Sequence, residues 1–156
     1  MALIHFAKIH QLNRTQWVSK PLEETFDFFA KPSNLQILTP PWLNFHITDA
    51  PEKLQAGSLI RYQLRIHGVP VHWTTEITEW NPPFSFVDIQ LVGPYKSWHH
   101  RHTFVAENNG TTIHDTVDYV LPFGPLGNLV NWILVSRDVN QIFNYRQQKI
   151  ASLFAS

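Results

Sequence analysis

The chain contains no cysteine, and charged side chains are scarce. The absence of cysteine excludes disulfide bonds, thiolate metal sites and cysteine nucleophiles. Charged residues make up 15% of the sequence, whereas an average globular domain has roughly 25%. The 12 basic and 12 acidic residues also cancel. A neutral chain offers no basic surface that would favour nucleic acid or an anionic membrane, so we expect neither as a partner.

Long apolar runs are missing as well. No stretch approaches about 18 consecutive apolar residues, so we expect no transmembrane helix and no integral membrane association. The first twelve residues, MALIHFAKIHQL, lack the uninterrupted apolar segment and the small-residue cleavage site of a secretory signal peptide. We therefore expect a cytoplasmic protein.

Aromatic and histidine residues are numerous, in contrast to the charged residues. The 156 residues include eleven Phe, six Trp and nine His. Such a composition excludes intrinsic disorder, which requires few aromatics and a high net charge. The length predicts one domain, covering residues 1–156, with a sizeable hydrophobic core.

The first third of the chain predicts one long strand and two short helices. Residues 4–18 alternate between apolar and polar side chains, as an extended strand does. Residues 21–30 begin with proline followed by two glutamates, which are helix-start signals. The sequence Pro-Ser-Asn at 32–34 indicates a break, and residues 35–38 predict a second helical turn that ends at the prolines of 40–41.

The middle of the chain predicts six further strands. Turn residues recur every 10 to 15 positions, which favours sequential antiparallel hairpins over parallel βαβ units. The expected strands are 43–48, 60–66, 72–80, 84–92, 95–105 and 111–121.

The C-terminal segment predicts a single long helix. Residues 122–127 are rich in proline and glycine and predict a rigid loop, whereas residues 128–154 contain neither breaker. Such a helix is about 40 Å long at ~1.5 Å per residue. Residues 129–135 are apolar almost all round, so we expect this half of the helix to be buried on more than one side.

These elements together predict an α+β fold with an internal space. An antiparallel sheet of seven strands curls through its own twist and needs cover on its concave face. One helix, roughly 10 Å across, is too narrow to fill that face. The remaining space predicts a ligand pocket, with the two short helices at one end and the loops 39–42 and 121–127 at its rim.

Several segments resemble one known superfamily. They are RTQWVSKPLEETFDFFAKPSNLQILTPPW at 14–42, WTTEITEWNPPFSFVDIQLVGPYKSWHHRHTF at 73–104, DYVLPFGPLG at 118–127 and FNYR at 143–146. Together with the element order they resemble the SRPBCC superfamily, which includes START lipid-transfer domains, birch-pollen-allergen-like proteins and polyketide cyclases. The resemblance implies the helix-grip fold, in which a curved sheet wraps around a long C-terminal helix. It implies no catalytic motif, because this fold hosts binders, carriers and enzymes.

The most distinctive local pattern is WHHRH at 98–102. Alternation on a strand places one set of side chains on one face: Trp98, His100, His102 and Phe104. The flanking aromatics indicate that this face points inward, with the two histidines about 7 Å apart along the strand. They are then histidines hydrogen-bonded within the core, ligand contacts, or groups for acid–base catalysis. His99 and Arg101 should face solvent.

A second polar pair, Asp88 and Gln90, lies on the preceding strand. The pair faces either water or the cavity, and the register of the hairpin decides between the two. A two-residue turn at 93–94 pairs Ile89 with Trp98, whereas a three-residue loop pairs Asp88 with His100. We favour the second register, because it gathers Asp88, Gln90 and His100 into one cluster whose hydrogen bonds can be satisfied.

Further wall residues are expected on the other strands and on the helix. Tyr62, Trp73 and Tyr119 each combine an apolar body with one hydrogen-bonding group. Asp115 shares a strand face with Tyr119. Arg146, about one turn after Phe143, either reaches an acidic ligand group or extends along the edge of the helix.

The H-x-H pair also has the spacing of two metal ligands, with His72 or Asp88 as a possible third. Such pairs recur by chance in a chain with nine histidines, so we expect no metal and no other cofactor. We do not find a nucleophile triad or a dinucleotide-binding motif.

The leading functional hypothesis is a non-enzymatic binder or carrier of a small hydrophobic or amphipathic molecule. Its expected ligand-binding residues are Tyr62, Trp73, Asp88, Gln90, Trp98, His100, His102 and Tyr119. The alternative is a cyclase or dehydrase acting on an aromatic polyketide-like substrate, with His100 or His102 as proton-transfer group and Asp88 orienting it. A third hypothesis is an accessory protein that binds a protein partner through an exposed face.

Overall fold

The alternating segments of the sequence form one seven-stranded antiparallel sheet in the computed structural model, which describes residues 7–155. The strands lie in the order β1-β7-β6-β5-β4-β3-β2. From β2 to β7 each strand therefore pairs with the next along the chain, and β7 also pairs with β1. The strands are β1 (His10–Val18), β2 (His46–Asp49), β3 (Leu59–Ile66), β4 (Val69–Asn81), β5 (Ser85–Val92), β6 (Ser97–Glu107) and β7 (Gly110–Val120). The helices are α1 (Leu22–Phe29), α2 (Pro32–Leu38), the 3-10 turn η1 (Pro41–Leu43), α3 (Gly124–Val130), the π-helical turn η2 (Asn131–Val135) and α4 (Ser136–Leu153).

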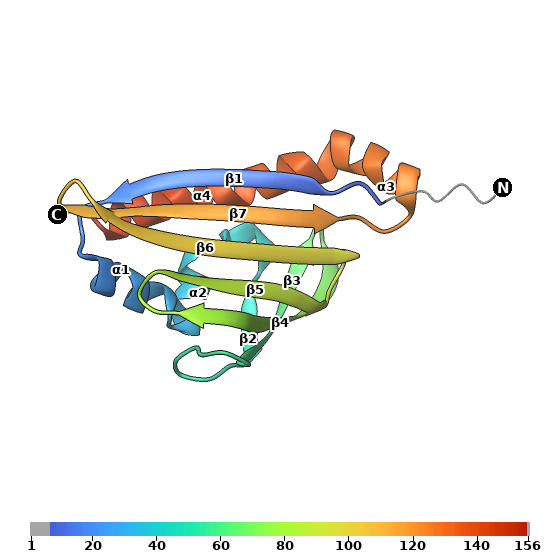
Figure 1. Cartoon of the computed structure of the whole chain (residues 1–156). Helices are drawn as coiled ribbons and strands as arrows, with labels where there is room; N and C mark the ends of the chain where they lie inside the picture. The colour runs from blue at the N-terminus through green and yellow to red at the C-terminus, as the bar shows by residue number, and fades with distance from the viewer. Residues whose placement is uncertain (1–6, 156) are drawn as a thin grey trace.

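The helices lie on one side of the sheet (Figure 1). The C-terminal helix extends along β1 and β7, while α1 and α2 lie at the end of the sheet where the chain terminates. A hydrogen bond from Ser19 Oγ to the carbonyl of Phe154 holds the end of the helix beside the link between β1 and α1. The predicted helix-grip architecture is therefore confirmed.

Hairpin turns set how the strands pair. Asn108 and Asn109 both have positive φ angles, 53° and 57°, as the two central residues of a type I′ turn require. Glu107 consequently pairs with Gly110, and the β6–β7 ladder continues from there in an unbroken register to Ser97 and Val120. This long ladder lies next to the β1 edge strand and carries most of the polar side chains described below.

The boundaries of the early elements differ from the sequence prediction in two places. The expected break at 32–34 is wrong, because Pro32 instead occupies the first turn of α2, where proline has no hydrogen bond to lose. The strand expected from residue 43 is also wrong in its first half: Leu43 ends η1, Asn44 adopts a left-handed conformation, and β2 begins only at His46. Residues 4–6 of the predicted first strand lie outside the described residues.

The C-terminal helix begins earlier than predicted. It is one helix of 30 residues, starting at Gly124, so the predicted loop 122–127 is wrong beyond Phe123. Pro125 lies in the first turn, a position that proline favours. The sequence analysis treated the Pro-Gly pattern as a breaker, whereas here it starts the helix.

The burial expected for the first half of this helix is wrong. Phe123 and Trp132 are each 81% exposed, and Leu126 and Ile133 are each 62% exposed. Within α3 and η2 only Gly127 and Asn131 are buried. The helix therefore contacts the sheet through one narrow face, even though its sequence is apolar all round. None of the helices within residues 7–155 is both long and apolar enough to span a membrane.

The exposure of Trp132 has a measurable consequence for stability. Trp132→Ser should change the free energy of unfolding by less than ~0.5 kcal/mol, because the side chain has little packing to lose. Phe143→Ala, which removes a buried ring of the same long helix, should cost about 3–5 kcal/mol. Urea unfolding monitored by circular dichroism measures both variants. A loss above ~2 kcal/mol for Trp132→Ser would show that this segment is buried after all.

Candidate functional site

A large cavity lies between the sheet and the C-terminal helix. Its volume is about 760 Å³, within the roughly 300–1,000 Å³ of typical small-molecule sites. Its walls come from α2, from β3 to β6 and from α4, and most of the side chains are aliphatic or aromatic. The apolar lining includes Leu38, Leu43, Phe45, Ile60, Leu64, Ile77, Phe86, Ile142 and Phe143. A seven-stranded sheet and one helix therefore leave the space that the sequence analysis anticipated.

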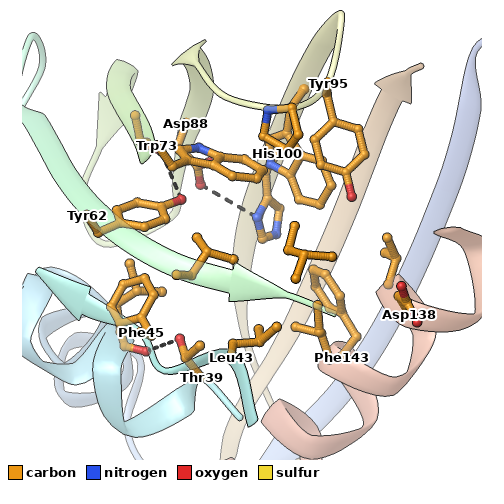
Figure 2. Close-up of a pocket in the computed structure, with 18 of the residues that line it drawn as sticks. Thr39, Leu43, Phe45, Tyr62, Trp73, Asp88, Tyr95, His100, Asp138 and Phe143 are labelled. Atoms are coloured by element: carbon orange, nitrogen blue, oxygen red, sulfur yellow. Dashed lines mark hydrogen bonds and ion pairs between the residues drawn. The ribbon is translucent and has the colours of Figure 1, made fainter. Parts of the chain in front are cut away.

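Six of the eight predicted ligand-binding residues lie on the cavity wall. They are Tyr62, Trp73, Asp88, Trp98, His100 and His102. Figure 2 shows Tyr62, Trp73, Asp88 and His100 grouped on the sheet side, facing Leu43 and Phe143 across the space. The Tyr62 ring stacks on Trp73 with centroids 5.8 Å apart. Burial raises the pKa of the Tyr62 hydroxyl, so this wall presents a neutral phenol.

The other two predicted residues lie elsewhere. Gln90 donates a hydrogen bond to the carbonyl of Tyr95 and accepts one from its backbone N–H, so its amide closes the β5–β6 turn rather than lining the cavity. Tyr119 donates to Oδ1 of Asn131 at 2.7 Å and stacks on His10. Its hydroxyl therefore fixes η2 against the sheet.

The register of the β5–β6 hairpin is the one that places Asp88 opposite His100. On the next ladder His102 lies opposite Asp115. Three adjacent strands thus bring two carboxylates and two imidazoles to one face of the sheet. The favoured register is confirmed, but the cluster contains Asp115 where Gln90 was expected.

The four side chains bond crosswise rather than straight across the strands. His102 Nε2 lies 2.7 Å from Asp88 Oδ2, and His100 Nε2 lies 2.8 Å from Asp115 Oδ1, so each imidazole donates to the carboxylate diagonal to it. The remaining nitrogens face the opposite carboxylates, at 3.6 Å from His100 Nδ1 to Asp88 and 3.1 Å from His102 Nδ1 to Asp115. The latter contact lacks hydrogen-bond geometry. Each ring therefore lies between two aspartates.

Aromatic packing holds the imidazoles in place. The two histidine rings lie 3.6 Å apart between centroids, and Phe86 stacks on the outer side of His102 at 4.0 Å. Phe143 of α4 meets His100 edge-on. His100 and His102 are only 4% and 3% exposed. Neither ring has space to rotate away from its carboxylate partners.

The electrostatics of the cluster separate the two histidines. Burial, reinforced by the neighbouring His102, lowers the pKa of His100 and favours its neutral form. Burial also opposes the charged form of His102, but the adjacent carboxylates of Asp115 and Asp88 outweigh it and raise the pKa. Two histidines in one cluster thus have pKa shifts of opposite direction.

Both carboxylates are held in the charged form. Burial alone would raise the pKa of Asp115, but Arg146 and the adjacent imidazoles of His100 and His102 hold it well below the ordinary value. Burial is likewise outweighed at Asp88, whose pKa is lowered by His100 and His102. Arg146 also packs its guanidinium over the rings of Phe29 and Phe143 at 5.4 and 5.9 Å. Basic side chains on both sides therefore stabilise the two buried carboxylates.

Asp115 is the important residue that the sequence analysis did not assign to the cluster. The signal was present, because a two-residue turn at Asn108 and Asn109 fixes the pairing of every later residue of the hairpin. Counting back from that turn places His102 opposite Asp115. Of the remaining predictions, Arg101 is exposed and pairs with Glu79 as expected for the outer face, and His72 is exposed, away from the cluster.

The fold and the mostly apolar cavity define this chain as a helix-grip protein of the SRPBCC superfamily. More particularly, the chain belongs to the family described as polyketide cyclase / dehydrase and lipid transport, whose profile matches residues 18–144. No curated protein gives a significant match.

Solved structures with the same fold come from several different organisms. Protein CV1439 from Chromobacterium violaceum has a TM-score of 0.72 at 11% identity, over 94% of this chain and 97% of its own. Protein Ms6760 from Mycobacterium smegmatis has a TM-score of 0.67 at 19% identity, over 92% and 89%. Ginseng major latex-like protein 151 from Panax ginseng has a TM-score of 0.66 at 13% identity, over 95% and 99%. At these identities the likeness concerns the fold alone.

The crosswise bonding predicts that Asp115 is important for stability. Asp115→Ala should destabilise the fold by about 3–5 kcal/mol, because it leaves the buried imidazoles of His100 and His102 without this carboxylate partner. The matched control is Asp118→Ala on the opposite face of the same strand, where the carboxylate bonds Gln11 near the surface. That change should cost no more than ~1 kcal/mol. Equal losses of unfolding free energy in the two variants, measured by urea unfolding, would contradict the prediction that the buried cluster stabilises the fold more than a carboxylate near the surface does.

Proposed function

We propose that this protein binds or carries a small hydrophobic or amphipathic molecule in the cavity between its sheet and its C-terminal helix. The observation that carries the proposal is the cavity of about 760 Å³ with its apolar walls. Burying a ligand against such walls is favourable because apolar surface leaves water on both sides. The family and the fold fit a protein that binds a hydrophobic ligand, which supports this proposal.

The distribution of polar groups favours an amphipathic ligand over a pure hydrocarbon. On the sheet side, Asp88, His100 and His102 form one polar area in a mostly apolar wall. A polar ligand group next to it finds hydrogen-bonding partners, whereas a purely apolar ligand would leave the Asp88 edge facing hydrocarbon. The other predicted contacts, Tyr62, Trp73 and Trp98, supply aromatic surface for the ligand body.

Filling the cavity tests the binding proposal directly. Leu64 is buried on β3 and lines the cavity, so Leu64→Trp should occupy part of the ligand space. We expect the affinity for the apolar fluorescent probe N-phenyl-1-naphthylamine to fall about 10-fold or more, which corresponds to at least ~1.4 kcal/mol.

The matched control places the same tryptophan outside the cavity. Val105 is 41% exposed on β6 and does not line the cavity, so Val105→Trp should leave probe affinity unchanged. Fluorescence titration and circular dichroism measure binding and folding for both variants. A wild-type protein that does not bind the probe, or equal affinities in both variants, would refute the cavity as the binding site.

A second candidate function is a cyclase or dehydrase acting on an aromatic polyketide-like substrate. The observation that favours it is the pair of histidines with opposite pKa shifts beside the cavity, because acid–base catalysis needs one group that accepts a proton and another that donates one. In this function His100 or His102 transfers the proton and Asp88 orients the imidazole.

His100→Ala tests the enzymatic alternative. With a synthetic poly-β-ketone thioester as substrate, the variant should lose water-eliminating turnover by about 100-fold or more, while probe affinity stays within about 3-fold. His99→Ala, on the other face of the same strand, is the control and should retain turnover. Mass spectrometry of the products measures both. Unchanged turnover in His100→Ala would reject the role of this residue, and absence of turnover in the wild type would leave the binder as the function.

A further inference from the structure

Three potential metal-ligand atoms lie close together in the buried cluster. Asp88, His100 and His102 each offer one nitrogen or oxygen atom, and these three atoms lie within 4.8 Å of one another. The sequence analysis set the H-x-H pair aside because spacing alone is weak. In the structure the third donor, Asp88, comes from the neighbouring strand and faces both imidazoles.

His100 shows why the arrangement suits a cation. Its Nε2–H donates to Asp115, so in the neutral ring Nδ1 carries a lone pair. That lone pair faces the Asp88 carboxylate oxygen at 3.6 Å. Among the described residues no hydrogen bond reaches this nitrogen. Two acceptors that face each other at this distance repel one another unless a positive charge lies between them.

The distances are close to those that a metal ion needs. Zinc binds histidine nitrogen and carboxylate oxygen at about 2.0–2.2 Å, which separates the ligand atoms of a tetrahedral site by about 3.3 Å. The contacts of Asp88 Oδ2 with His102 and with His100, at 2.7 and 3.6 Å, lie on either side of that separation. Small side-chain movements therefore suffice to admit an ion.

Asp115 provides the second requirement of a histidine metal site. Ligating histidines commonly bond a carboxylate through the nitrogen that does not bind the metal. Asp115 Oδ1 lies 2.8 Å from His100 Nε2 and 3.1 Å from His102 Nδ1. It therefore orients the other nitrogen of each ring toward Asp88. The two carboxylates also carry the charge that a divalent ion requires.

We propose that Asp88, His100 and His102 bind a divalent transition-metal ion such as Zn²⁺, with Asp115 orienting both imidazoles. Two histidines and one carboxylate are a ligand set that such ions favour. The ion takes the place of the proton on His102 Nε2. A charged ring releases that proton to solvent, whereas in a neutral ring the proton moves to Nδ1, which then donates to Asp115. All three ligands line the cavity, so the open coordination positions face the space where the proposed ligand binds.

The first test uses the unaltered protein. Metal-free wild-type protein is titrated with Zn²⁺ in competition with a fluorescent zinc chelator, and separately with Co²⁺, whose visible absorption bands report nitrogen and oxygen ligands. We expect one ion per chain and a Co²⁺ spectrum of four or five coordination. Absence of binding, or the spectrum of the hydrated ion, overturns the proposal without any variant having to fold.

The second test locates the ion with matched variants. Asp88→Asn and His102→Gln should weaken zinc binding more than 100-fold, and Asp115→Asn by about 10–100-fold, as expected for a residue that only orients ligands. His99→Gln, on the opposite face of the same strand, should leave zinc binding unchanged. Arg146→Met should strengthen it several-fold, because Arg146 acts electrostatically on both aspartates and a like charge repels the ion.

Binding that survives Asp88→Asn, or that falls equally in His99→Gln, overturns the assignment of these ligands. The inference does not rest on the proposed function, and the two can fail separately. Loss of zinc binding leaves the affinity for N-phenyl-1-naphthylamine untouched if the cavity alone binds the probe. Conversely, a protein that binds zinc but not the probe retains the metal site and loses the proposed function.

Discussion

The polar part of this structure depends on burying two imidazoles between two carboxylates. Ionised carboxylates cost several kcal/mol to bury unless they are paired and hydrogen-bonded. Here neighbouring strands deliver the partners: Asp88 from β5, His100 and His102 from β6, and Asp115 from β7. A shift of one residue in either ladder would turn one partner to the outer face of the sheet and leave charges unpaired. The cluster therefore favours the same strand register that the hairpin turns specify.

The cavity follows from the geometry of a curved sheet around one helix. The helix contacts the sheet through a single narrow face and cannot fill the concave side, and the two short helices cover only one end (Figure 1). Aromatic rings then line the space without closing it, as Tyr62 and Trp73 do by stacking along the wall. This arrangement explains why a neutral chain with few charges needs so many aromatics, although Trp132 shows that not all of them belong to the interior.

The binding proposal and the metal proposal concern adjoining parts of one cavity. The apolar walls of Leu43, Phe45 and Leu64 suit the body of a ligand, while the cluster at Asp88 suits its polar end or an ion. Arg146 belongs to both, because its guanidinium packs over Phe29 and Phe143 while its charge acts on the two aspartates. The aspartates thus stay ionised in a largely apolar surrounding, which is the condition for either role.

Alternation and turn residues are local signals, and they were sufficient to predict the order of the elements, the antiparallel sheet and the inward face of β6. The sequence also placed Asp88 opposite His100 once a turn length was chosen. Gln90 and Tyr119 were expected in the cavity but lie outside its wall. The start of the C-terminal helix was expected to be buried, because an apolar sequence gives no signal of how much of a helix surface is covered. The completion of the cluster by Asp115 and the crosswise bonds could not be predicted in this way. They depend on three strands meeting side by side and on the rings of Phe86 and Phe143, which pack against the two histidines.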